Sequence, residues 1–89
     1  MGWLKKCDDV LVQEIDEDLV LLNLSSEEYY ALNKTARRFW EAASDGANRD
    51  SVVATLQKEF GVDQERISRD LDRLVGALAE RRLATVQAS

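Results

Sequence analysis

The amino-acid sequence predicts an α+β fold, a winged helix-turn-helix in which a three-stranded antiparallel sheet is followed by three helices. Alternating apolar residues, typical of strands, occupy the first third of the chain, and apolar residues at helical spacing occupy the rest. The connections between these segments are short, and proline is absent. We therefore expect residues 1–89 to form a single domain with its core in about residues 9–84.

Three strands are predicted, and they span residues 9–16, 19–24 and 28–32. The first ends in a DED sequence that suits a turn. The second, LVLLNL, is apolar on nearly both faces, as expected for the middle strand of a small sheet. In the third, EYYAL, Tyr30 and Leu32 share one face while Tyr29 and Ala31 share the other. We expect the face with Tyr30 to join the core.

Three helices are predicted to follow, over residues 34–44, from a cap at Asn48 or Asp50 to Phe60, and from Asp63 to about Arg82. Asn33 and Asp63 can accept hydrogen bonds from free N–H groups of the first turn, and Gly61 suits a left-handed position after a helix. The predicted buried faces comprise Ala36, Phe39, Trp40 and Ala43, then Val52, Val53, Leu56 and Phe60, then Ile67, Leu71, Leu74, Val75 and Leu78. For residues 83–89 we expect brief packing or fraying.

The sequence lacks residues that many catalytic sites need. Cys7 is the only cysteine and histidine is absent, so an internal disulfide, a zinc framework and a histidine triad are excluded. The glycines are scattered, so no phosphate-binding loop is recognisable. The acidic pairs at 8–9 and 27–28 lie in polar surroundings that are typical of solvated surfaces. We therefore expect a non-enzymatic binding protein without a cofactor or metal.

The sequence carries no membrane or export signal. No apolar run reaches 18 residues, and the start, MGWLKKCDD, lacks the long apolar segment of a signal peptide. The single cysteine is consistent with a reduced thiol in the cytosol. We expect a cytoplasmic protein without a membrane partner.

The charge distribution argues against nucleic acid as a partner, because binding to phosphates depends on clustered cations. The net charge is −5. Residues 1–33 contain two lysines against eight acidic residues, a charge of −6, so the remainder carries +1. After its cap, Asp63, the third predicted helix has five arginines against four acidic residues, which is too weak a charge for a DNA-reading helix. An acidic winged-helix transcription regulator or a protein–protein adaptor remains the alternative function.

The order and spacing of several motifs resemble one known family. The segments are VLLNLSSEEYYALNKTARRFWEAASDGA and LQKEFGVDQERISRDLDRLVGALAERRLA. They resemble the family of the pyrroloquinoline quinone synthesis protein PqqD, also called the RiPP precursor-peptide recognition element. YYALN and RFWEAASDGA are most similar to the freestanding leader-binding subunits of split lasso-peptide biosynthesis systems.

This resemblance implies a non-catalytic domain that binds the leader of a ribosomally made precursor peptide and delivers it to a leader peptidase or other modifying enzyme. The leader would pair as an extra strand with the third strand, in a groove walled by the third helix. The expected peptide-binding residues are Glu28, Tyr29, Tyr30, Ala31, Leu32, Arg66, Asp70, Arg73, Leu74 and Ala77. We expect a monomer or a weak homodimer.

Two details of that groove are hypotheses from the residues themselves. Asp70, with Arg66 or Arg73, would hydrogen-bond the leader, while Leu74 and Ala77 would border an apolar slot. The alternative for Asp70 is a solvated acid or a salt bridge to an arginine one turn away.

Overall fold

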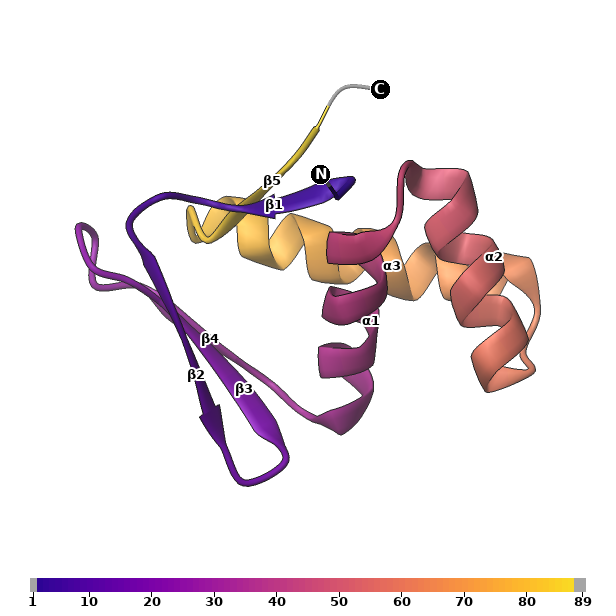
Figure 1. Cartoon of the computed structure of the whole chain (residues 1–89), viewed down its shortest axis with the longest axis horizontal. Helices are drawn as coiled ribbons and strands as arrows, with labels where there is room; N and C mark the ends of the chain where they lie inside the picture. Colours follow the sequence, from indigo (N-terminus) through magenta and orange to yellow (C-terminus); the bar gives the residue numbers. More distant parts are fainter. Residues whose placement is uncertain (1, 88–89) are drawn as a thin grey trace.

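The computed structural model describes residues 2–87, and in it a three-stranded antiparallel sheet precedes three helices (Figure 1). The predicted α+β fold, a winged helix-turn-helix, is confirmed. The elements are β1 Leu4–Lys6, β2 Val10–Ile15, β3 Asp18–Asn23, β4 Tyr29–Leu32, α1 Lys34–Asp45, α2 Arg49–Phe60, α3 Gln64–Glu80 and β5 Ala84–Val86. Within residues 2–87 no helix is both long and apolar enough to span a bilayer.

The three-stranded sheet has the order β2-β3-β4, so the apolar strand β3 is in the middle as predicted. Strands β2 and β3 form a hairpin whose loop begins at Asp16, a residue with a φ of 57°. A positive φ at this position suits the twist of a two-residue hairpin loop. Side chains alternate along β4, where Leu32 is fully buried and Tyr29 is 65% exposed. The inward face predicted for Tyr30 and Leu32 is therefore confirmed, since Tyr30 packs against the core.

Asn23 is the one buried polar residue among those described, and no local pattern in the sequence indicates its role. Its side-chain oxygen accepts hydrogen bonds from the backbone N–H groups of Ser25 and Ser26, at 2.9 and 3.0 Å. Its side-chain nitrogen donates to the carbonyl oxygen of Arg82 at 2.7 Å. Asn23 thus shapes the β3–β4 turn and joins it to the end of α3, with its amide oxygen and nitrogen both hydrogen-bonded.

Each helix begins at a capping side chain. The Asn33 and Asp63 side chains accept from the N–H groups of Ala36 and Arg66, both at 2.9 Å, as predicted. At α2 the cap is Asn48 rather than Asp50. Asn48 is reinforced by Ser51, which bonds back to the Asn48 backbone. Each cap satisfies N–H groups that the helix itself leaves free.

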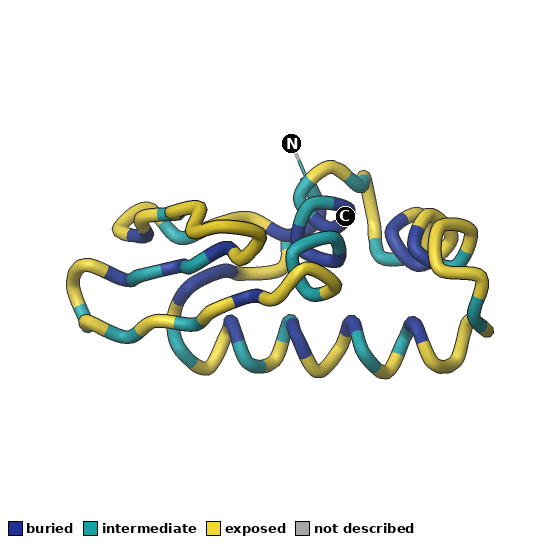
Figure 2. The backbone as a smooth tube through the Cα atoms, turned by 90° about the horizontal axis from the view of Figure 1, so that it is seen from below, coloured by how far each residue is buried: buried dark blue, intermediate teal, exposed yellow. Residues whose placement is uncertain are grey.

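The apolar faces of the helices pack into one core with the inner face of the sheet. Figure 2 shows the buried positions of α3 recurring once per turn on the side that faces the other elements. The prediction that Phe60 is buried is wrong, because this last residue of α2 is 37% exposed. Its ring contacts Phe39 at a centroid distance of 5.6 Å, and part of the ring remains open to solvent.

Two partly exposed arginines of α1 connect it to neighbouring elements. Arg37 pairs with Glu14 of β2. Arg38 bonds both carboxylate oxygens of Glu59 in α2, at 2.8 and 2.5 Å. These hydrogen bonds lower the pKa of Glu59. Solvent screening keeps the stabilisation from such surface pairs small.

Helix α3 ends two residues earlier than predicted, because Arg82 adopts a left-handed conformation with a φ of 58°. The Leu83 N–H donates to the Leu78 carbonyl at 2.9 Å, and the Arg82 N–H donates to Ala79 at 3.1 Å, the pattern of a Schellman C-cap. The chain then reverses into β5, which pairs antiparallel with β1 in a two-stranded sheet that was not predicted. Leu83 is fully buried, whereas Val86 is 44% exposed.

Replacement of Arg82 by glycine should stabilise the protein. A left-handed conformation strains a residue with a β-carbon by about 1–2 kcal/mol, and glycine removes that strain at an entropic cost of roughly 0.5–1 kcal/mol. We expect a net gain of about 0.5–1 kcal/mol, which raises the melting temperature by about 2–8 °C. Thermal denaturation followed by circular dichroism measures this shift. Arg81→Gly is the matched control, since Arg81 has a φ of −93° and should not gain stability.

Candidate functional site

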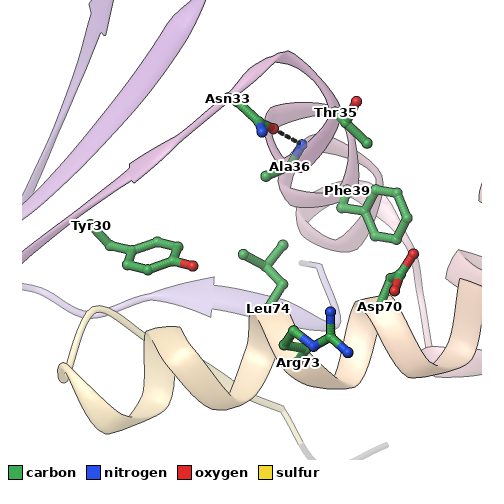
Figure 3. A pocket seen from close by; sticks show the side chains of 8 residues that line it. All are labelled: Tyr30, Asn33, Thr35, Ala36, Phe39, Asp70, Arg73 and Leu74. Atoms are coloured by element: carbon green, nitrogen blue, oxygen red, sulfur yellow. Dashed lines mark hydrogen bonds between the residues drawn. The ribbon is translucent and has the colours of Figure 1, made fainter.

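A groove of about 340 Å³ lies between β4, the first turns of α1 and the middle of α3 (Figure 3). Its lining residues are Tyr30, Asn33, Thr35, Ala36, Phe39, Asp70, Arg73 and Leu74. The cap at Asn33 starts α1 directly after β4, so one continuous segment supplies the strand edge and one end of the groove. The opposite wall comes from α3, which is distant in sequence and is held there by the core.

The α3 wall combines an apolar side chain with two charged ones at helical spacing. Arg73 and Leu74 lie three and four residues after Asp70, so both project from the same side of the helix as Asp70. Leu74 is 7% exposed, and in Figure 3 it lies between Tyr30 on one side and Phe39 and Asp70 on the other. The wall thus offers an apolar centre with charged groups beside it.

Asp70 is half-buried, and no ion pair within residues 2–87 joins it to Arg66 or Arg73. The salt bridge considered from the sequence is therefore not formed. In Figure 3 the Asp70 carboxylate points from α3 toward Phe39. Its oxygens can accept hydrogen bonds from a group placed in the groove.

Tyr30 forms the end of the groove near the β3–β4 turn. Its ring extends from β4 toward Leu74, as Figure 3 shows. The guanidinium carbon of Arg81 lies 4.8 Å from the ring centroid, a cation–π arrangement. Arg81 also donates to the Ala77 carbonyl at 3.1 Å, which anchors the guanidinium to its own helix. The Tyr30 ring is therefore held by α3 as well as by its strand.

β4 is an edge strand, so half of its main-chain groups have no partner strand among the described residues. The Asn23 N–H donates to the Glu28 carbonyl at 2.8 Å, just before β4 begins. Because hydrogen-bonded pairs alternate in an antiparallel ladder, the next ones are Leu21 with Tyr30 and Leu19 with Leu32. The N–H and C=O groups of Tyr29 and Ala31 consequently point away from β3, toward the open edge.

The predicted site residues fall into two sets. Tyr30, Asp70, Arg73 and Leu74 line the groove together. The other six do not line it. Near β4, Leu32 is in the core, Tyr29 and Ala31 are exposed on the other face, and Glu28 precedes the strand. On α3, Arg66 is exposed in the first turn, and Ala77 is partly buried three residues beyond Leu74.

The sequence prediction did not include the α1 side of the groove, which is formed by Asn33, Thr35, Ala36 and Phe39. A signal for them was present. A helix cap directly after an edge strand places the first helical turn beside the end of that strand, independently of how the other elements pack. Within residues 2–87 no group of three or more acidic or cysteine side chains is placed to hold a metal ion.

These features define a small winged helix-turn-helix domain in which an edge strand and the third helix enclose an open groove. The chain belongs to the PqqD family, since the model of that family, described as coenzyme PQQ synthesis protein D, matches residues 18–84. The resemblance stated from the sequence motifs is thereby confirmed.

Two solved structures are similar to this chain over nearly its whole length. One is described as TbiB1 in complex with the TbiA(beta) leader peptide; it is 30% identical, with a TM-score of 0.81, and the match covers 96% of this chain and 99% of that one. The other is described as lasso peptide synthetase B1 complexed with the leader peptide; it is 30% identical, with a TM-score of 0.82, and the match covers 94% and 99%. No curated protein sequence matches the chain significantly.

Proposed function

We propose that this protein binds the leader segment of a ribosomally synthesised precursor peptide and delivers it, without catalysis, to a leader peptidase or other modifying enzyme in the cytoplasm. The observation that carries the proposal is the open edge of β4 beside a groove that α3 closes on the other side. Both similar structures are described as leader-peptide complexes, which supports the same ligand class here.

In the proposed complex the leader adds as a strand to β4. The outward N–H and C=O groups of Tyr29 and Ala31 pair with the leader main chain, while alternate leader side chains enter the groove. Tyr30 and Leu74 provide apolar contact, and Asp70 and Arg73 bond polar groups of the leader. Arg66 and Ala77 extend this wall along α3 and contact the leader where it leaves the groove.

The energetics suit a transient carrier. Two leader side chains buried in the groove contribute roughly 1.5–3 kcal/mol each. Several strand hydrogen bonds add about 0.5–1.5 kcal/mol each, and ordering the leader costs about 2–5 kcal/mol. The balance corresponds to a dissociation constant of about micromolar or somewhat tighter. Such binding is strong enough to recruit a peptide and weak enough to release it.

Titration of a fluorescently labelled leader peptide tests this function. We expect saturable binding near the micromolar range for a leader encoded beside this gene, and none for a scrambled peptide of the same composition. Absence of saturable binding below about 100 µM to every leader encoded nearby would contradict the proposal. Retardation of random duplex DNA at moderate salt would instead favour the winged-helix regulator.

Replacement of Asp70 by alanine should weaken leader binding without unfolding the domain. The carboxylate is half-buried beside the groove and forms no ion pair within residues 2–87, so its removal leaves no charged partner behind. Loss of a hydrogen bond to a charged group corresponds to about 1.5–3 kcal/mol, or roughly a tenfold or greater loss of affinity.

Asp72→Ala is the matched control for Asp70→Ala, because Asp72 lies on the same helix but pairs with Arg49 away from the groove. The comparison uses the same leader titration, with melting curves for both variants. Equal affinities for the Asp70 and Asp72 variants would show that Asp70 does not contact the leader.

A further inference from the structure

The sheet has a second apolar surface, on the side opposite the helices. Side chains alternate along each strand, and those that point away from the core come together through the strand register. Leu11 of β2 pairs with Leu22 of β3, which pairs with Tyr29 of β4; Val20 pairs with Ala31 in a neighbouring row. We call this surface the outer sheet face; its residues are Leu11, Gln13, Ile15, Asp18, Val20, Leu22, Tyr29 and Ala31.

The outer sheet face leaves several large apolar side chains exposed to solvent. Leu11 is 48% exposed, Ile15 51% and Tyr29 65%, and these are half of the large hydrophobic side chains that residues 2–87 leave exposed. The opposite face of the same strands carries the buried Leu21 and Leu32. Exposed apolar patches on monomeric proteins are often functional, which makes this face a candidate contact surface.

Acidic residues border this face at both ends. Asp16, Glu17 and Asp18 lie at the β2–β3 hairpin, while Asp8, Asp9 and Glu27 lie at the other end of the sheet. None of these six side chains forms an ion pair with a cation of residues 2–87. A second copy of this chain, in either orientation, would bring like charges together there. The complementary partner presents an apolar patch bordered by lysine or arginine.

The size of the face also restricts the partner. Three strands of up to six residues span about 14 Å by about 20 Å, or roughly 280 Å² of flat surface. A stable interface buries about 800 Å² per partner, so this face alone supports only a transient contact. A leader strand added to β4 would widen the same face by a fourth strand. The leader side chains that point outward would then lie beside Tyr29 and Ala31.

We propose that the outer sheet face binds the modifying enzyme. The enzyme contacts a combined surface, which consists of β2, β3, β4 and the outward side chains of the bound leader. This inference rests on the proposed leader binding and assigns the surface by which the carrier is recognised. The groove holds one side of the leader, and the enzyme covers the other. Enzyme binding is consequently stronger to the carrier with leader than to the carrier alone.

The double variant Leu11→Thr/Ile15→Thr tests the surface. Threonine keeps the strand preference and removes apolar contact at the strand farthest from the leader edge. The affinity for labelled leader should change by less than about twofold, while the affinity for the leader peptidase encoded beside this gene should fall by about tenfold or more. Val86→Thr is the matched control, since Val86 is similarly exposed, at 44%, but lies on β5 outside this face.

A second measurement addresses the acidic border. Asp18→Asn should slow association with the peptidase, and added salt should weaken wild-type binding. The inference is overturned if the double variant binds the peptidase as the wild type does, with and without leader. It is also overturned if sedimentation shows a wild-type dimer that the double variant abolishes, since a second copy would then occupy the face. If the wild-type protein binds the peptidase but does not bind any leader peptide, the proposed function is contradicted instead.

Discussion

Replacement of Ala31 by proline will lower the affinity for a leader peptide by about tenfold or more, with the fold retained. Hydrogen-bonded pairs alternate along β4, so the Ala31 N–H points to the open edge and is not used in pairing with β3. Proline removes this donor, and an edge strand tolerates proline on its outward side. The leader loses a strand hydrogen bond, and a carbonyl of the leader is left unpaired at a cost of about 1–3 kcal/mol.

The measurement is a leader titration with the variant and with Ala31→Val, which keeps the N–H at the same position. The valine variant should bind as the wild type does, and both variants should melt cooperatively. Tyr29→Pro removes the neighbouring outward donor and should reproduce the loss. Wild-type affinity in both folded proline variants would rule out strand addition at β4.

Replacement of Trp40 by alanine will remove a large part of the stability of the protein. Trp40 is 8% exposed in α1 and belongs to the core that joins the helices to the inner sheet face. Truncation of a buried tryptophan costs about 3–5 kcal/mol. A chain of 89 residues has a free energy of unfolding of about 4–13 kcal/mol, so this variant is expected to be largely destabilised.

Chemical denaturation followed by circular dichroism measures this loss. Phe60→Ala is the control, because Phe60 is also aromatic but is 37% exposed at the end of α2, and its truncation should cost clearly less. Similar losses for the two variants would show that Trp40 is not a principal core residue. Asp70→Ala should keep the wild-type denaturation curve. This result would distinguish a loss of leader binding from a loss of the fold.

The elements with strong local signals were predictable from the sequence. The side chains of Asn33 and Asp63 accept hydrogen bonds from N–H groups three residues later in the chain. Such caps can therefore be recognised from local sequence. The apolar faces of α1 and α3 follow from helical spacing, because only one side of each helix can meet the core. Gly61 has a φ of 66°, as expected for a glycine after a helix.

The elements that were missed depend on residues far apart in sequence. Strands β1 and β5 are three residues each, too short for a periodic pattern, and they exist because each supplies the other's hydrogen bonds. The role of Asn23 depends on a carbonyl 59 positions away, at Arg82. The exposure of Phe60 depends on how far the end of α2 extends beyond the core, which helical spacing does not indicate.

For the candidate site, local sequence patterns predict which residues are available: a strand with two tyrosines, a helix with Asp70, Arg73 and Leu74 on one face, and an acidic first third. That these residues meet α1 across one groove, and that Leu11, Leu22 and Tyr29 form a second face, depends on how the elements pack together. The reason is physical: local spacing selects the face of an element, but packing of the shared core decides which faces meet.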